Sequence, residues 1–307
     1  GIGALQVVLD KGEQEDWFAS GWIMALAIIS AGTLIVFVFY ELQKHGPVVD
    51  LQVFKLRTYS TGVVLMMNVG FGLYGSLVLL PIFLQTLLGY SALQAGNAMA
   101  PRGIGSLIAM PIIGVIMSKF DPRKLLATGF VLASVTTIWL GRLNLNAGYW
   151  DIFWPQFIQG ISLGLLFVPL TTITMDPIPR EQMGNATSLF NLVRNIGGSM
   201  GIATVTTILA RRQQMHISVL GSHVTPYSLK AQMTLQGAQQ YFEQQGVDAY
   251  TAGRRAHAMV FGMVQQQAAM LSFNEVFWLL GIIFLVFLPL LLLLKRPRVG
   301  RNGVAAR

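Results

Sequence analysis

Seven long apolar stretches divide this 307-residue chain, and they constrain its fold more than any other feature. Each is close to the ~20 residues that a helix needs to cross the hydrocarbon core of a bilayer. Only 11% of the residues are charged, against roughly 25% in soluble domains. The sequence therefore predicts an all-α integral membrane protein. The predicted spans are 22–40, 61–87, 92–117, 125–140, 153–173, 184–209 and 273–294.

The distribution of Lys and Arg between these stretches predicts the orientation of the chain. Three connections (41–60, 118–124 and 174–183) and the tail 295–307 hold 12 basic residues, whereas the short opposite loops hold only Lys11 and Arg142. Basic loops stay on the cytoplasmic side of a membrane, so we expect the C-terminus there. The net charge of +8 is therefore a topology signal, and no nucleic-acid partner is expected.

One apolar segment, 184–201, carries polar side chains that a lipid-facing helix does not tolerate. An arginine at mid-membrane depth is costly, so it should face a cavity or a protein partner. A Gly-x-x-x-Gly spacing follows, which lets a second helix approach closely. We expect this helix to offer both a polar contact and a close-packed conformational seam. The polar residues are Asn191, Arg194 and Asn195, and the glycines on the same and adjoining stripes are Gly197, Gly198 and Gly201.

Three other predicted spans contain polar residues, and each has a functional and a structural interpretation. Arg102 either lines a cavity, caps neighbouring carbonyl groups or extends outwards to the interface. Gln156 and Gln159 share one helix face, where they either line a substrate path or hydrogen-bond a neighbouring helix. Asn68 lies in the second span. We expect these residues to line or shape a central cavity.

The connection 210–272 is long and rich in Gln. Its apolar positions predict amphipathic helices over 229–245 and 249–271, lying on the outer face or meeting a partner. Glu275, just after this connection, is expected at the membrane interface. His216, His223 and His257 lack ligand spacing and the chain has no Cys, so no metal site is expected. The polar residues suit a transport path and no enzymatic site is predicted.

Several short motifs, spread over nearly the whole chain, resemble those of one transporter family. They are Leu9-Asp10-Lys11-Gly12 with Asp16-Trp17-Phe18, Pro47-Val-Val-Asp50-Leu51 with Phe54-Lys55, Trp154-Pro155-Gln156-Phe157-Ile158-Gln159-Gly160, Pro169-Leu-Thr-Thr-Ile-Thr174 and Asn274-Glu275-Val-Phe277-Trp278. The chain resembles the C-terminal portion of a 14-helix major facilitator superfamily drug:proton antiporter of the EmrB/QacA type.

The resemblance implies a division of the chain into four parts. Residues 1–21 would be the end of a preceding helix and an outer loop, and 22–60 an extra central helix with a cytoplasmic linker. Residues 61–294 would form the C-terminal six-helix bundle, with 210–272 as a periplasmic connection, and 295–307 a basic cytoplasmic tail. The chain is then expected to be part of a longer protein of the bacterial cytoplasmic (inner) membrane.

The resemblance also implies roles for particular residues. Segment 194–198 would correspond to the antiporter motif of the other half, and its glycines would permit rocking. The segment 114–124 would be a degenerate copy of the cytosolic gating motif, in which Ser118 replaces the acid and Asp121 the glycine. Its gate residues are Gly114, Lys119, Asp121, Arg123 and Lys124. Aromatic contacts to substrate would come from Phe71, Tyr74, Phe83 and Phe190.

The function implied is secondary active efflux: proton-coupled export of amphipathic drugs or toxic compounds by alternating access, with the proton gradient in place of a cofactor. Expected partners are the lipid bilayer, hydrophobic or cationic small molecules, a periplasmic adaptor and an outer-membrane channel. No span carries an acid in its middle, so no proton-coupling residue is assigned. Two alternatives stay open: export of a narrow physiological solute such as a siderophore, peptide or lipid, and a non-transporting truncated fragment.

Overall fold

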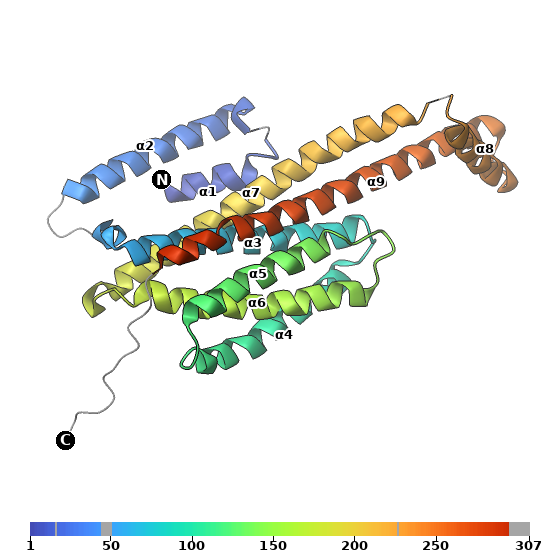
Figure 1. Ribbon diagram of the computed structural model, residues 1–307. Helices are drawn as coiled ribbons and strands as arrows, with labels where there is room; N and C mark the ends of the chain where they lie inside the picture. The colour runs from blue at the N-terminus through green and yellow to red at the C-terminus, as the bar shows by residue number, and fades with distance from the viewer. Residues whose placement is uncertain (16, 44–50, 226, 295–307) are drawn as a thin grey trace, which may run out of the picture.

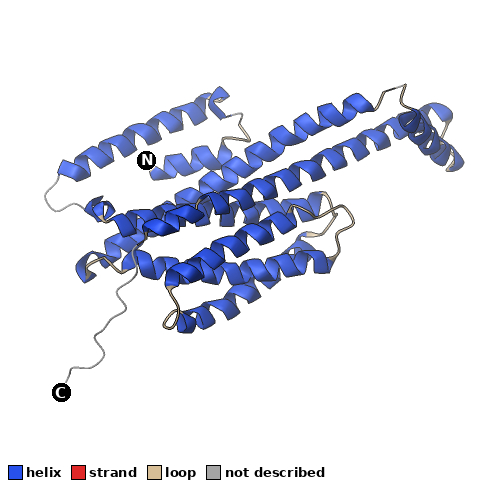
Figure 2. Ribbon diagram, viewed as in Figure 1, coloured by secondary structure: helices blue, strands red, loops and turns tan. Residues whose placement is uncertain are grey.

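The computed structural model describes residues 1–15, 17–43, 51–225 and 227–294, and within these residues every regular element is a helix (Figure 2). Asp16, Lys44, the motif segment 47–50 and the expected basic tail 295–307 lie outside the described residues. The α-helices are α1 (Ile2–Lys11), α2 (Gly21–Gln43), α3 (Arg57–Thr86), α4 (Ala92–Ile116), α5 (Pro122–Leu140), α6 (Tyr149–Met175), α7 (Met183–His223), α8 (Leu229–Gln244) and α9 (Ala249–Val286). Short 3₁₀ helices cover Trp17–Ala19, Leu51–Lys55, Arg180–Gln182 and Leu288–Leu293.

Six long helices, α3 to α7 and α9, form the bundle, and α1 and α2 lie beside it (Figure 1). Helix α6 packs between α4 and α5, while α7 packs between α3 and α9. Helix α3 also contacts α6 and α9, and α5 contacts α9, which joins the two groups. Helix α1 contacts α7, and α2 packs on α1. Large apolar side chains such as Ile28, Val36 and Phe39 remain exposed on α2, as suits a helix surrounded by lipid.

Within the described residues, six helices are long and apolar enough to cross a membrane: the segments Gly21–Glu41, Arg57–Thr86, Ala92–Ile116, Pro122–Leu140, Tyr149–Met175 and Ala249–Leu293. The seventh predicted span, 184–209, is helical but is not among them. Its polar residues Asn191, Arg194 and Asn195 lower its hydropathy. This helix nevertheless packs against α3 and α9 inside the bundle, where its neighbours replace lipid.

The connection 210–272 is helical over both predicted ranges, as α8 and the first part of α9, but it joins the predicted spans differently than expected. Helix α7 does not end at Leu209 and α9 does not begin at Phe273; both continue as one antiparallel pair, with α8 packed on α9 at its tip (Figure 1). We call this extension, residues 210–272, the hairpin. No proline interrupts either helix before the tip, and Gln, Arg and Ala favour helix in water. The 41 residues of α7 span about 60 Å, twice the ~30 Å hydrocarbon core, so the hairpin extends beyond the membrane.

Glycines bring α3 and α7 into backbone contact. A Cβ on Gly197 would meet the carbonyl oxygen of Met67, and one on Gly201 would meet that of Phe71. In the opposite direction, a Cβ on Gly70 would meet the carbonyl oxygen of Arg194. The close approach expected from the spacing of Gly197 and Gly201 is present, and its partner is α3 of the same bundle.

A second glycine contact joins α4 and α6. A Cβ on Gly160 would meet the carbonyl oxygen of Arg102, and one on Gly105 would meet that of Phe157. Small residues at such positions allow the van der Waals contacts that hold helices together in lipid. These two interfaces fix the separations within the two helix pairs.

Replacing Gly201 by Ala is expected to destabilise the protein, because the new methyl group meets the backbone of α3 and neither helix can yield by a side-chain rotation. Overpacking of this kind costs about 1–3 kcal/mol. The matched control is Gly103→Ala on α4, where the methyl group meets no atom within 4 Å. Thermal unfolding in detergent measures both, and equal midpoints for the two variants would contradict the α3–α7 contact.

Candidate functional site

Buried polar side chains form a layer across the middle of the bundle. Along α3, α5 and α6 this layer separates two hydrophobic clusters, which occupy the two ends of the bundle. On α6, for example, one cluster ends at Ile152 and the other begins at Leu166. Buried polar groups need hydrogen bonds, so their partners decide what each one does. This buried polar layer includes Ser76, Arg102, Thr137, Gln156 and Gln159.

Arg102 links α4 to α3 within this layer. Its side chain is only 6% exposed, and Nη2 donates to Oγ of Ser76 at 3.2 Å. Its Nη1 is buried without a partner. The arginine therefore does not extend to the interface, and the structure favours the interpretation in which it braces neighbouring helices.

Gln156 and Gln159 form a chain of hydrogen bonds between α6 and α5. Nε2 of Gln156 donates to Oε1 of Gln159, and Nε2 of Gln159 donates to Oγ1 of Thr137, both at 3.2 Å. The two side chains are 0% and 3% exposed. In this conformation neighbouring helices cover both side chains, so neither lines an open cavity, and Oε1 of Gln156 is buried without a hydrogen-bond partner. Asn68 is likewise 3% exposed, and its Oδ1 has no partner.

Asn191, Arg194 and Asn195 remain accessible. Asn195 is exposed and the other two are half-buried, on the part of α7 beside α3. Arg194 places its carbonyl against Gly70, and its Nε is without a hydrogen-bond partner. Thr187 and Ser188, also exposed, lie within the same ~120° arc of the helix. We call this set of five residues the α7 polar face.

Two of the four predicted aromatic residues adjoin this face. Phe71 and Tyr74 of α3 are half-buried, and the Tyr74 ring lies against Gly198 of α7. Phe83 and Phe190, by contrast, are 1% and 2% exposed in the two hydrophobic clusters. Neighbouring helices enclose both rings in this conformation, so neither is exposed to a substrate here.

The predicted gate lies on the turn between α4 and α5. Asp121 caps α5, its Oδ1 accepting from the backbone N–H of Arg123 at 3.1 Å, and Pro122 occupies the first turn. Lys119 and Lys124 are exposed, as is Gly114, around which no atom lies within 4 Å of an added Cβ. The turn thus presents basic side chains outward from the bundle.

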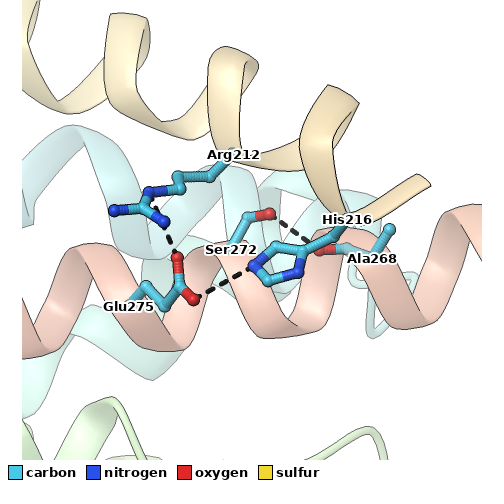
Figure 3. Close-up of polar contacts among 5 residues, drawn as sticks. All are labelled: Arg212, His216, Ala268, Ser272 and Glu275. Carbon is cyan, nitrogen blue, oxygen red and sulfur yellow. Dashed lines mark hydrogen bonds and ion pairs between the residues drawn. The ribbon is translucent and has the colours of Figure 1, made fainter. Parts of the chain in front are cut away.

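Sequence reasoning missed an ion cluster at the base of the hairpin. Nε of Arg212 lies 3.4 Å from Oε2 of Glu275, and Nε2 of His216 lies 3.1 Å from Oε1 (Figure 3). Arg212 and His216 come from α7 and Glu275 from α9. The available signal was the i, i+4 spacing of Arg212 and His216, which places them on one face only if α7 continues past Leu209.

Two aromatic residues at the start of α6 show where the bundle meets an interface. Trp150 and Trp154 are 64% and 50% exposed. Both pack around Phe153, with ring centroids 5.2 Å apart in each pair. Tryptophan gathers where hydrocarbon meets water, so this end of α6 lies at a membrane surface.

The sequence matches the family model of the Major Facilitator Superfamily over residues 8–202. This covers more than half of the chain, and the chain belongs to that superfamily of membrane transporters. With its apolar helices it is a multi-pass membrane protein, and the family implies a transporter instead of an enzyme.

Comparison with individual relatives indicates which transporters of this superfamily the chain resembles. The chain is 38% identical to the fatty acid resistance protein FarB of Neisseria gonorrhoeae and 36% identical to the multidrug export protein EmrB of Escherichia coli, over 305 residues in each case. It is 34% identical over 300 residues to EmrB of Haemophilus influenzae. These alignments cover 97–99% of this chain but only 57–58% of the relatives. They confirm the resemblance to EmrB-type proteins drawn from the motifs.

Thr137→Val tests the buried polar layer. It removes the acceptor of Gln159 while retaining the shape of the side chain, and a buried group left unpaired costs about 1–3 kcal/mol. Thr128→Val is the matched control, because Thr128 is exposed on the same helix and shares only the bond to the carbonyl four residues earlier. Unfolding should begin at a lower temperature for Thr137→Val alone; coincident unfolding curves would show that the interhelical bond contributes nothing.

Proposed function

We propose that this chain is the C-terminal part of a secondary active efflux transporter that exports amphipathic drugs or toxic compounds, coupled to the proton gradient, by alternating access. The observation that carries the proposal is the α7 polar face, which joins Arg194 and two asparagines to a glycine contact with α3. Membership of the Major Facilitator Superfamily and similarity to multidrug export proteins support it.

The chemistry of this face suits an amphipathic substrate. Asn191 and Asn195 offer amide donors and acceptors, and the half-buried Arg194 offers a positive charge. Phe71 and Tyr74 supply apolar surface beside them. Polar groups near the middle of a membrane helix are retained at a cost and commonly mark a substrate path. Arg102, Gln156, Gln159 and Asn68 would then shape the pathway from behind, as the buried support of its walls.

The glycine contact would serve the conformational change. Because Gly197 and Gly201 lie directly on the backbone of α3, α7 has no side chains there to interlock with its neighbour. Such a surface permits small sliding movements between packed helices. The conformational seam assigned to Gly197, Gly198 and Gly201 thus lies, in our proposal, between α3 and α7. Exposed Lys119 and Lys124 would contribute to the cytoplasmic gate of an inner-membrane protein whose C-terminus is cytoplasmic.

The hairpin suggests a meeting point for a periplasmic adaptor, which would in turn reach an outer-membrane channel. Its tip exposes large apolar side chains that a free water-facing surface normally lacks: Tyr227 is 95% exposed, Tyr250 77%, Leu229 65% and Met233 61%. A groove of about 580 Å³ between α7, α8 and α9, lined in part by Val260 and Phe261, lies at the same end.

Export of fatty acids is a second candidate, favoured by the similarity to FarB, whose name describes fatty acid resistance. An aliphatic carboxylate is an amphipathic compound that Arg194 could pair. A panel of aromatic drugs and fatty acids in one transport assay separates this narrower function from multidrug export.

Arg194→Ala in the full-length protein is expected to lower transport into inverted membrane vesicles by at least about tenfold, since hydrogen bonds to charged groups are worth about 1.5–3 kcal/mol. Arg255→Ala, an exposed arginine in the hairpin, is the control and should leave transport unchanged. Transport at the wild-type rate by Arg194→Ala, at equal expression, would refute the central role of the α7 polar face.

Met233→Asp tests the adaptor surface. The change places a charge in exposed apolar surface on α8 and should weaken co-purification of the adaptor, without loss of folded protein. Gln236→Asp, which adds the same charge at an exposed polar position of α8, serves as the control. If neither substitution reduces co-purification, this end of the hairpin is not the adaptor contact.

A further inference from the structure

A groove of about 670 Å³ lies where α7 and α9 leave the apolar part of the bundle, beside the end of α5. Helices α7 and α9 form its walls, and Gly141, which follows α5, closes one side. The groove lies next to the ion cluster at the base of the hairpin; Figure 3 shows that cluster. It is separate from the α7 polar face, which occupies the preceding turns of α7.

The groove changes character along its length. Towards the hairpin its walls carry the charged residues Arg211, Arg212 and Glu275, beside Leu271 and Asn274. Towards the bundle they carry only apolar side chains, among them Ile208, Trp278 and Ile282. Because α7 and α9 run antiparallel, the polar residues of both helices gather at the same end. The result is a cationic mouth that leads into an apolar channel.

The charges at the mouth do not cancel. Glu275 already pairs with Arg212 and contacts His216. Arg211 is exposed and makes no ion pair within the described part of the chain. Arg142 lies outside the groove, in a neighbouring pocket that Asp151 also lines, and its guanidinium carbon is 5.6 Å from the centre of the Trp278 ring. An anionic group at the mouth would therefore meet unpaired positive charge.

The surface around the groove is suited to face lipid. On α9, Trp278 is 39% exposed and Ile282 47%; on α5, Val135 is 53% exposed and Trp139 43%. Exposed apolar side chains of this size are ordinary on a membrane helix in contact with acyl chains, and tryptophan marks the level of the headgroups. The cationic mouth thus lies at headgroup level, with the apolar channel directed into the hydrocarbon.

We propose that this groove binds a phospholipid with an anionic headgroup, taken from the leaflet on the hairpin's side of the membrane. Its phosphate lies at Arg211, and one acyl chain lies along Ile208, Trp278 and Ile282. Basic residues between membrane helices favour anionic over zwitterionic lipids through their charge. The lipid would hold the base of the hairpin to the bundle, and the site does not depend on what the protein transports.

Native mass spectrometry of the purified full-length protein with phosphatidylglycerol or phosphatidylcholine tests the site. The wild type is expected to bind phosphatidylglycerol more tightly, and Arg211→Gln to weaken that binding about fivefold, the effect of one basic residue near a membrane surface. Binding of phosphatidylcholine should not change. Arg211 was chosen because its removal breaks no ion pair inside the described chain, so the fold is retained.

Arg254→Gln is the matched control, since Arg254 is an equally exposed arginine on the hairpin, away from the groove. It should bind phosphatidylglycerol as the wild type does. Equal binding of the two lipids by the wild type, or equal loss in both arginine variants, would overturn the proposal. If a fatty acid anion is transported more slowly by Arg211→Gln while lipid binding is unchanged, the groove is a substrate entrance and the lipid assignment is wrong.

Discussion

Backbone contact at glycine positions is the interaction on which the six-helix bundle depends. Lipid is as apolar as leucine, so helices in a membrane gain little from hiding apolar side chains against one another. Van der Waals contact between closely approaching helix backbones supplies the attraction instead. Gly197 and Gly201 bring α7 onto α3, and Gly105 and Gly160 bring α4 onto α6. Since α3 and α6 touch each other, these two contacts connect four helices.

The membrane makes every polar side chain costly, and this bundle uses its polar residues in two ways. Arg102, Gln156 and Gln159 bond across helices in a layer that solvent and lipid do not reach. Asn191, Arg194 and Asn195 stay accessible on the same helix as the glycine contact. Residues in the first group hold helices together, whereas those in the second are the ones that our proposal assigns to the substrate path.

The hairpin lies outside the membrane, where water hydrates polar side chains that would be costly in lipid. Once α7 and α9 leave the hydrocarbon, Gln, Arg and His can occupy exposed helix positions without penalty. The two helices therefore continue as a pair, and charged residues on their facing sides meet. Glu275, at the boundary, pairs with Arg212 and His216 and joins the hairpin to the bundle.

The transporter family and the helices of the bundle, apart from the outer parts of α7 and α9, could be predicted from the sequence, because local motifs suffice for the family and spans of apolar residues for the helices. The close contact of Gly197 and Gly201 followed from their spacing alone. The partners of the polar side chains could not be predicted in this way. Thr137 accepts a hydrogen bond from Gln159, Ser76 accepts one from Arg102, and Phe83 and Phe190 are buried by neighbouring helices. Only the tertiary structure decided these, because a polar side chain shows that it must avoid lipid without showing which neighbour lies beside it.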